Sequence, residues 1–228
     1  MEVLPVHIGY IVDGNRRWAN AHHMTTLQGH LAGYEALKTV LFDTIARGVP
    51  YVSAYVFSTE NWNRSAVEVN YLMTLILRVL RDDIHLFIEQ NVRLRIIGSR
   101  ERLSKKVIQA IDNAETATAH LTGGQGLICL NYGGQLEIAD AVTAMIKAGV
   151  NEQVITPARL AEFMYAPDVP ACDLIVRTSG EQRLSNFMLW RSAYSELMFI
   201  DTLWPDMTKH DVTTILEAYT KRSRRFGG

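Results

Sequence analysis

The sequence predicts an α/β fold, a single domain in which helices flank a mostly parallel central sheet. Short apolar, β-branched segments alternate along the chain with longer segments of helical periodicity, the pattern of strands and helices packed in layers. The chain has 228 residues, of which 48% are hydrophobic and 21% are charged. This composition supports one full core and argues against disorder. We therefore expect residues 1–228 to form one domain without a linker or a repeat.

The strands are predicted from apolar runs that end at turn residues. Residues 6–12 read VHIGYIV and run into a DGN turn, and residues 51–57 read YVSAYVF. Residues 92–97 alternate in polarity, as expected of a strand with two different faces. Further strands are expected at 126–130, 174–177, 187–190 and 197–199. Ligands bind beyond the carboxyl ends of parallel strands, so the segments that follow these strands are the first candidates for a site.

The helices are predicted from apolar residues at helical spacing and from the residues that end them. They are expected at residues 17–22, 31–47, 66–90, 102–120, 137–147, 157–164 and 209–221. The longest of them bends near Asp82 and Asp83, and its apolar residues extend most of the way around it. Such a helix is buried on two sides, or it packs one face on the sheet and lines an apolar tunnel with the other.

The charge balance and the cysteines limit the classes of function. With 23 basic and 24 acidic residues the net charge is −1, which excludes a global basic field, so we expect no nucleic-acid partner. Cys129 and Cys172 lack the spacing of metal ligands or of a disulfide scaffold, which favours a reducing compartment. No segment reaches about 18 apolar residues without charge. We therefore expect a cytoplasmic protein.

The first candidate segment follows the first strand and reads DGNRRW, residues 13–18. Gly14 lets the backbone approach a ligand, and exposed N–H groups at a helix start attract an anion. Arg16 and Arg17 add donors that suit phosphate. Asp13 would repel phosphate unless Mg²⁺ lay between them, held by the carboxylate and the phosphate oxygens. The alternative is a plain turn in which Asp13 pairs with Arg16 or Arg17.

Two further candidate segments follow later strands. Residues 57–64, FSTENWNR, bring together hydroxyls, an amide, a carboxylate, an indole and a guanidinium; the alternative is a helix cap. Residues 177–186, RTSGEQRLSN, place two arginines six residues apart across a turn of small residues. The alternative there is a solvated loop with an ion pair between Glu181 and Arg183. Taken together, arginines beside hydroxyls and glycines at three strand ends predict two phosphate sites and a metal.

The chain resembles the cis-prenyltransferase family, the undecaprenyl diphosphate synthase type, over nearly its whole length. The matching segments, in one order, are DGNRRWA, GHLAGYEAL, YVFSTENWNR, VRLRIIG, LNYGG, RTSGEQRLSNFMLW, YSEL, LWPD and RRFGG. The resemblance implies a homodimeric α/β enzyme with a hydrophobic tunnel. Its reaction would condense isopentenyl diphosphate onto an allylic diphosphate, farnesyl or geranyl diphosphate. The product would be a medium-chain Z-polyprenyl diphosphate of the undecaprenyl carrier-lipid class, released with a peripheral membrane contact.

The resemblance also implies a role for each matching residue. Asp13 would hold Mg²⁺ and assist the departure of pyrophosphate, with Glu196 as the second metal ligand. Asn61 would accept a proton, although an amide is a very weak base and the departing pyrophosphate is the alternative acceptor. The tail over residues 224–228 would complete the partner subunit's site. The residues that would bind the two substrates are Gly14, Asn15, Arg16, Arg17, Trp18, His30, Ser58, Thr59, Glu60, Trp62, Arg64, Arg177, Arg183, Leu184 and Ser185.

Several positions depart from the family pattern. Thr26 stands where an arginine usually precedes the Gly-His pair, which removes one diphosphate contact. Gln182 stands where many members have histidine, which lowers the expected affinity for the metal. Val56, Cys129 and Leu130 are larger than the residues frequent at tunnel-facing strand positions. Since the long helix also lacks an insertion, we expect a product of undecaprenyl length or shorter.

Three other functions stay open from the sequence. A non-catalytic family member that scaffolds an active partner would have lost the metal and diphosphate residues, yet these residues are present. A phosphate-ester hydrolase would explain phosphate binding but neither the wide apolar helix nor the ordered motifs. The third alternative is a synthase of short-chain Z-prenyl diphosphates.

Overall fold

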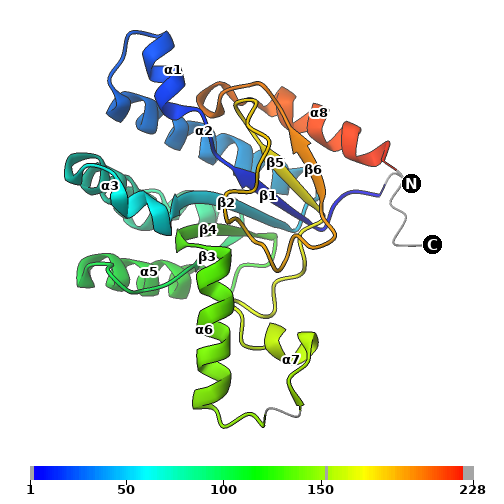
Figure 1. Ribbon diagram of the computed structural model, residues 1–228. Coiled ribbons are helices and arrows are strands. Elements are labelled where there is room, and N and C mark those ends of the chain that lie inside the picture. The colour runs from blue at the N-terminus through cyan, green and yellow to red at the C-terminus, as the bar shows by residue number, and fades with distance from the viewer. Residues whose placement is uncertain (1–2, 152–153, 223–228) are drawn as a thin grey trace.

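The computed structural model describes residues 3–151 and 154–222, and these form a parallel six-stranded sheet with helices packed on it (Figure 1). The strands are β1 His7–Ile11, β2 Tyr51–Ser58, β3 Val92–Ile97, β4 Gly124–Tyr132, β5 Leu174–Arg177 and β6 Glu196–Phe199. They lie in the order β3-β4-β2-β1-β5-β6, and each neighbouring pair is parallel. The predicted α/β fold is confirmed.

The helices connect these strands. They are α1 Asn15–Ala21, α2 Thr26–Ala46, α3 Ala66–Arg81, α4 Ile84–Glu89, α5 Lys105–Thr118, α6 Gly134–Lys147, α7 Pro157–Ala161 and α8 Lys209–Thr220, with 3-10 turns η1 Thr59–Asn63 and η3 Trp204–Asp206. α2 begins at Thr26, ahead of its predicted start, because Thr25 and Gln28 cap each other. Thr25 Oγ1 accepts the Gln28 N–H at 3.3 Å, and Gln28 Oε1 accepts the Thr25 N–H at 2.8 Å.

Two predictions about elements need correction. The expected bend at Asp82 and Asp83 is a complete break, since α3 ends at Arg81 and α4 begins at Ile84. There the Asp83 carboxylate accepts the Tyr34 hydroxyl and lies 3.2 Å from Lys38 Nζ, which fastens the break to α2. The strand expected at 187–190 is absent from the described fold, and these residues form turns. Met188 has φ of 45°, a left-handed backbone that a strand does not accommodate.

Alternation along the strands divides the core in two. Tyr10 and Ile128 face the larger core, to which α2, α3, α5 and α8 contribute. Ile11 and Cys129 face the smaller core, which residues between 165 and 188 cover. The helices whose side chains line the apolar cavity described below therefore lie on the face of the sheet that carries the larger core. None of the described helices combines the length and the apolar character that crossing a membrane requires.

His7 fastens the amino end of β1 inside the fold. It is fully buried, its Nδ1–H donates to the Pro170 carbonyl at 2.9 Å, and its Nε2 lies 2.7 Å from Ser53 Oγ. Since the carbonyl can only accept, the neutral ring uses Nε2 to accept the Ser53 hydroxyl. Burial lowers the pKa of His7 from 6.5 to about 4.

This buried histidine predicts a loss of stability in mild acid. The folded-state pKa lies below the unfolded value, so its contribution is complete above pH 6.5 and is lost as the pH falls toward about 4. The free energy of unfolding should fall by up to about 3 kcal/mol from this group. His7→Gln, which does not titrate there, should flatten the dependence. Urea unfolding of both proteins across this range measures the difference, and equal slopes would contradict the prediction.

Candidate active site

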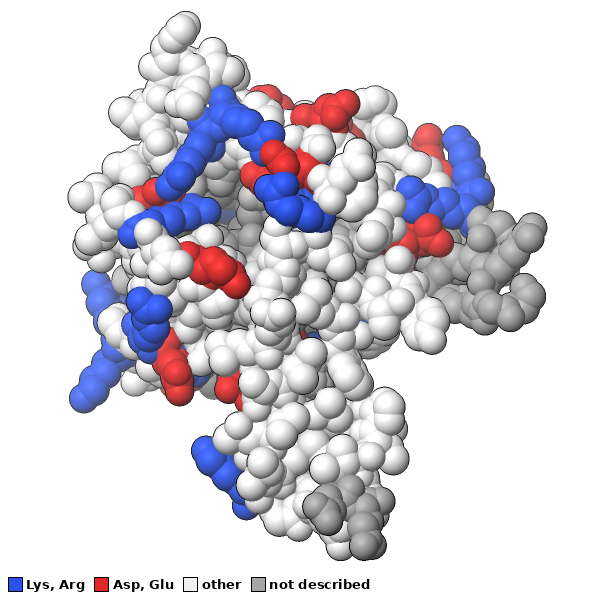
Figure 2. Space-filling view, in the orientation of Figure 1, with Lys and Arg blue, Asp and Glu red and all other residues white. Residues whose placement is uncertain are grey.

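The three predicted site segments meet because their strands are neighbours. β1 pairs with β2 on one side and with β5 on the other, all parallel. Residues 13–18, 58–64 and 177–186 therefore leave the sheet at the same edge. Figure 2 shows basic and acidic side chains gathered around a hollow in the surface of the molecule.

Two adjoining cavities occupy this edge. We call them the α1 cavity, of about 400 Å³, and the β5 cavity, of about 540 Å³. The α1 cavity is lined by Val12, Asp13, Gly14, Asn15, Arg16, Arg17, His30, Tyr55, Val56, Asn61, Arg64 and Leu72. The β5 cavity is lined by Ile11, Val12, Asp13, Tyr55, Ser58, Glu60, Asn61, Arg64, Arg177, Ser185 and Asn186. Asp13, Asn61 and Arg64 line both cavities and so lie at their junction.

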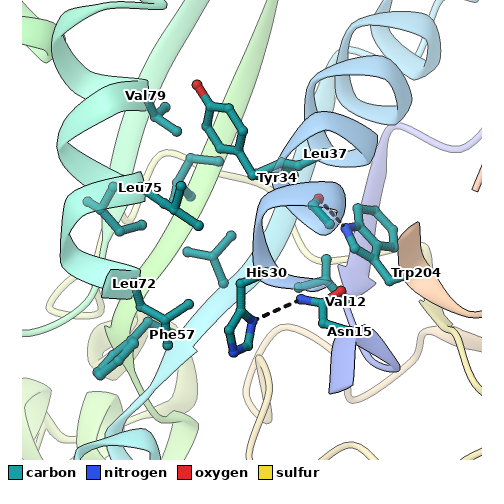
Figure 3. Close-up of a pocket in the computed structure, with 14 residues that line it drawn as sticks. Val12, Asn15, His30, Tyr34, Leu37, Phe57, Leu72, Leu75, Val79 and Trp204 are labelled. Atoms are coloured by element: carbon teal, nitrogen blue, oxygen red, sulfur yellow. Dashed lines mark hydrogen bonds between the residues drawn. The ribbon is translucent and has the colours of Figure 1, made fainter. Parts of the chain in front are cut away.

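A narrow apolar tunnel continues from the α1 cavity (Figure 3). The two spaces share the lining residues Val12, Asn15, His30, Val56 and Leu72. Further in, the walls come from α2, α3 and the sheet. The tunnel holds about 60 Å³, much less than either of the two cavities outside it. A long hydrocarbon chain therefore fits only if the side chains that line the tunnel move apart.

The inner end of the tunnel is closed by three apolar side chains. Leu37, Val79 and Ile128 line both the tunnel and a smaller pocket of about 10 Å³ behind it. Phe42 and Phe87 line that pocket and contact each other edge to face, with ring centroids 5.0 Å apart. These residues form a floor to the tunnel.

The residues whose size was expected to narrow the tunnel lie on different faces of the sheet. Val56 lines the tunnel, as expected. Leu130 packs in the larger core, whereas Ile128, two residues earlier on the same face, lines the tunnel. Cys129 points to the smaller core on the opposite face of the sheet. Its expected contribution to the tunnel is therefore wrong.

Asp13 is an ionised carboxylate held by two arginines. Its Oδ2 accepts from Arg177 Nη2 at 2.7 Å, and its Oδ1 lies 3.5 Å from Arg17 Nη2. Burial opposes ionisation, but the hydrogen bond and charge of Arg177, with the charge of Arg17, hold the pKa of Asp13 below its ordinary value. The pairing with Arg17 that a plain turn predicts is therefore present, and Arg177 adds a second partner from another strand.

Arg177 has a buried donor without a partner in the described part of the chain. Its Nη1 donates to Ser185 Oγ at 2.7 Å and to the Arg183 carbonyl at 2.6 Å. Its Nε makes no hydrogen bond there. An unsatisfied buried donor is costly, and an anion oxygen would satisfy it. The Glu181 and Arg183 side chains form the ion pair expected of a solvated loop, so Arg177 is the better-placed arginine of this segment.

Close packing of α1 on α2 brings Asn15 to His30. A Cβ atom at Gly33 would lie 2.4 Å from Asn15 Oδ1, and one at Gly29 would lie 2.2 Å from the Asn15 carbonyl oxygen. Only glycine fits at these two positions, and Asn15 Nδ2 then lies 3.4 Å from His30 Nδ1. Trp204 Nε1 donates to the Gly33 carbonyl at 2.8 Å and supports the same contact from outside.

Glu68 is a residue of this site that the sequence reasoning missed. It lies on α3, it is buried, and its carboxylate accepts from Arg16, His30 and Arg64. Its spacing of four residues from Arg64 is the one signal in the sequence that could have indicated it.

Most of the predicted substrate-contacting residues line the two cavities. They are Asp13, Gly14, Asn15, Arg16, Arg17, His30, Ser58, Glu60, Asn61, Arg64, Arg177 and Ser185. The predicted residues that do not line them are Trp18, Thr59, Trp62, Arg183, Leu184 and Glu196.

The two tryptophans have partners elsewhere. Trp18 Nε1 donates to Asp206 at 2.6 Å, its ring stacks on His22, and it is not among the residues that line the α1 cavity. Trp62 Nε1 donates to Asn131 Oδ1 at 2.8 Å, and its ring packs edge to face on Phe57. Both indoles therefore support the segments that carry the arginines.

Leu184, Thr59 and Gln182 also lie outside the cavities. Leu184 packs against the smaller core. Thr59 begins η1, the turn at the end of β2, where a cap was the alternative prediction, and Asn61 Oδ1 accepts the Ser58 N–H at 3.1 Å within the same turn. Gln182 is exposed.

Glu196 lies at the opposite end of the sheet from Asp13. It begins β6 and pairs with Leu174, which in turn pairs with Ile8 near the amino end of β1. At about 3.3 Å per residue, Asp13 is roughly 15 Å further along. Arg222 Nη1 donates to Glu196 at 2.8 Å. A single chain therefore does not bring Asp13 and Glu196, the two predicted metal ligands, together. The tail over residues 224–228, which was expected to complete the partner's site, lies outside the described residues.

The donor set at Asp13 suits Mg²⁺ only together with substrate. No group of three or more His, Cys, Asp or Glu side chains that could hold a metal occurs in residues 3–151 and 154–222. Mg²⁺ typically needs only one or two carboxylates when substrate phosphates supply the other oxygens. Asp13, at the junction of two cavities with arginines on both sides, fits that arrangement.

Comparisons with known proteins agree along the whole chain. The prenyltransferase family model, described as undecaprenyl diphosphate synthase, matches residues 11–227. The chain is 44% identical to a trans,polycis-polyprenyl diphosphate synthase ((2Z,6E)-farnesyl diphosphate specific) of Thermobifida fusca, covering 100% of this chain and 82% of that protein. It is 43% identical to an isoprenyl transferase of Thermotoga maritima, covering 99% and 97%.

Solved structures with the same fold include two related enzymes. Lavandulyl diphosphate synthase from Lavandula x intermedia, in complex with dimethylallyl diphosphate, superposes with a TM-score of 0.95 at 31% identity over 100% of both chains. A probable undecaprenyl diphosphate synthase from Campylobacter jejuni superposes with a TM-score of 0.84 at 29% identity, again over 100% of both chains.

Proposed function

Because the chain belongs to the cis-prenyltransferase family and is a Z-prenyl chain synthase, we propose that its two cavities hold its two substrates. The allylic diphosphate occupies the α1 cavity and isopentenyl diphosphate occupies the β5 cavity. One observation carries this assignment: the α1 cavity, through five shared lining residues, continues into the apolar tunnel. The growing hydrocarbon belongs to the allylic substrate, so its diphosphate belongs at the tunnel mouth.

The reaction breaks the C–O bond of the allylic diphosphate, forms a C–C bond to the isopentenyl alkene and releases one proton. Negative charge develops on the leaving diphosphate, where Arg16, Arg17 and Arg64 stabilise it more than the ground state. Arg177 and Ser185 hold the second substrate in line, which is catalysis by proximity.

We assign the proton to the departing pyrophosphate. Asn61 Oδ1 already accepts the Ser58 N–H at 3.1 Å, and an amide is a very weak base. The Asn61 amide N–H group then serves as a donor to the diphosphates at the junction of the cavities.

Asp13 would hold Mg²⁺ together with phosphate oxygens of the substrate. When bound, the ion supplies neutralisation of the charge that develops on the leaving group. Since Glu196 lies at the far end of the sheet, we propose that it serves the site of a second copy in a homodimer. A cytoplasmic location and contact with a membrane at product release complete the proposal.

The small size of the tunnel favours a product at the short end of the range that the sequence predicts. Its volume of about 60 Å³ and its floor of Leu37, Val79 and Ile128 support this second candidate, a synthase of short Z-prenyl diphosphates. A structural relative, lavandulyl diphosphate synthase, binds the short dimethylallyl diphosphate. We therefore expect products of undecaprenyl length or shorter.

A direct assay tests the proposal. The protein is incubated with labelled isopentenyl diphosphate and allylic diphosphates of increasing length, with Mg²⁺ or with EDTA, and the products are sized. We expect condensation only with the divalent cation. Release of inorganic phosphate without condensation would indicate a hydrolase. Inactivity that only a related partner relieves would indicate a scaffold.

Asp13→Ala should abolish turnover without unfolding the protein. Removal of one strong electrostatic stabiliser lowers kcat by at least about 100-fold. Asp168→Ala is the matched control, because it removes an exposed carboxylate that pairs with Arg95 outside both cavities. Steady-state kinetics at saturating Mg²⁺ compare the two variants. Near-normal kcat in Asp13→Ala would refute its assignment.

Val56→Ala should lengthen the product distribution, because it removes two methyl groups from the tunnel wall. Leu130→Val trims a buried side chain of the neighbouring strand outside the tunnel lining and should leave the distribution unchanged. Chromatographic sizing of labelled products measures both. Identical ladders for Val56→Ala and the unmodified protein would show that the floor, rather than the tunnel mouth, sets the length.

A further inference from the structure

Three basic side chains from different segments converge on Glu68. Arg16 of α1 donates through Nε to Glu68 Oε1 at 3.2 Å and through Nη2 to Oε2. Arg64, which follows η1, donates through Nη1 to Oε1 at 2.9 Å. His30 of α2 donates through Nε2–H to Oε1 at 2.9 Å. One carboxylate therefore joins four segments of the chain.

Glu68 lies behind the α1 cavity rather than in it. Arg16, His30 and Arg64 line that cavity, whereas Glu68 is buried and lines none of the cavities described above. A diphosphate in the cavity meets the basic groups, and the carboxylate supports them from the far side. Glu68 is thus placed to orient the donors without repelling the substrate at contact distance.

The donors that Glu68 leaves unused are the ones a diphosphate needs. Arg16 uses Nε and Nη2 on the carboxylate, and Arg64 uses Nη1. Arg16 Nη1 and Arg64 Nη2 have no partner in the described chain. Arginine has high rotamer freedom, and binding is weakened when that freedom is lost on association. Holding both side chains beforehand avoids this loss.

The ionisation states of Glu68 and His30 follow from their burial and from the charges around them. Burial opposes its ionisation, but hydrogen bonds from Arg16 and His30 and the charge of Arg64 keep the pKa of Glu68 below its ordinary value. Burial lowers the pKa of His30, and the charges of Arg64 and Arg16 add to this, while Glu68 opposes it. The cluster consists of one anion, two cations and a largely neutral imidazole at neutral pH.

Glu68 lies one helical turn before the tunnel-lining residues of α3. Leu72 follows Glu68 by one helical turn, and Leu75, Ile76 and Val79 continue the lining (Figure 3). Ser65 Oγ caps the helix by accepting the Glu68 N–H at 3.3 Å. The carboxylate therefore fixes the tunnel wall to the diphosphate-binding arginines.

We infer that Glu68 is a positioning residue for the allylic substrate, a role that rests on the proposed placement of the allylic diphosphate in the α1 cavity. It holds Arg16 and Arg64 in the orientation that the diphosphate requires and aligns the tunnel entrance with them. It makes no such contact with Arg177 or Ser185, so it affects isopentenyl diphosphate only through Arg64, which lines both cavities.

Glu68→Gln removes the charge at nearly constant volume. We expect KM for the allylic diphosphate to rise about tenfold, the size of losing one charge-assisted hydrogen bond. KM for isopentenyl diphosphate should stay within about twofold, a split that general loss of structure does not produce. Glu68→Asp keeps the charge and should recover part of the affinity. Binding of a slowly reacting allylic thiodiphosphate, followed by calorimetry, measures the same change without turnover.

Glu137→Gln is the matched control. Glu137 is a fully buried carboxylate that accepts from Arg191 Nη1 at 2.6 Å and lines none of the cavities described above. Its variant should lower Tm to a similar extent and leave both KM values unchanged. An equal rise of both KM values in Glu68→Gln, or a fall in the allylic KM, would overturn the inference.

Arg64→Ala separates this inference from the proposed function. If Arg64→Ala raises the allylic KM and Glu68→Gln does not, the positioning role fails while the placement of the substrate holds. If neither variant changes the allylic KM, the placement itself is wrong.

Discussion

The site depends on the side-by-side order of β2, β1 and β5. Because these strands are parallel neighbours, three segments that lie up to 164 residues apart in sequence reach one edge of the sheet, as in the hydrogen bond from Arg177 to Asp13. A different strand order would leave each arginine on its own loop. The larger core, on one face of the sheet, keeps that order and supplies the tunnel walls.

The chemistry rests on placing charge directly beside hydrocarbon. His30 and Asn15 line both the polar α1 cavity and the apolar tunnel, so the boundary between the two is only a side chain wide. Low-dielectric walls strengthen the attraction between fixed arginines and a leaving diphosphate. In the proposed arrangement the same walls exclude water from an allylic cation, which favours condensation over hydrolysis.

The sequence predicted what is local. Strand ends, turn residues and ordered motifs indicated the fold and the arginines of the cavities, since these patterns depend on neighbouring residues. The partners of a side chain can lie far away in the sequence, and these the sequence did not indicate: Trp18 donates to Asp206, and Trp62 donates to Asn131. Glu68 was missed because only the folded chain surrounds it with basic groups. The break after α3 likewise depends on Tyr34, which lies on another helix.

The floor formed by Leu37, Val79 and Ile128 has a consequence for how this enzyme can evolve. In the proposed arrangement the diphosphate is held at the tunnel mouth, and the floor stops the hydrocarbon tail at the opposite end. The residues that limit the product length therefore lie far from the bonds that break. Selection can then alter the product length by exchanging one apolar side chain of the floor, while the rate of each condensation stays unchanged. Product length and reaction rate can therefore change independently of each other.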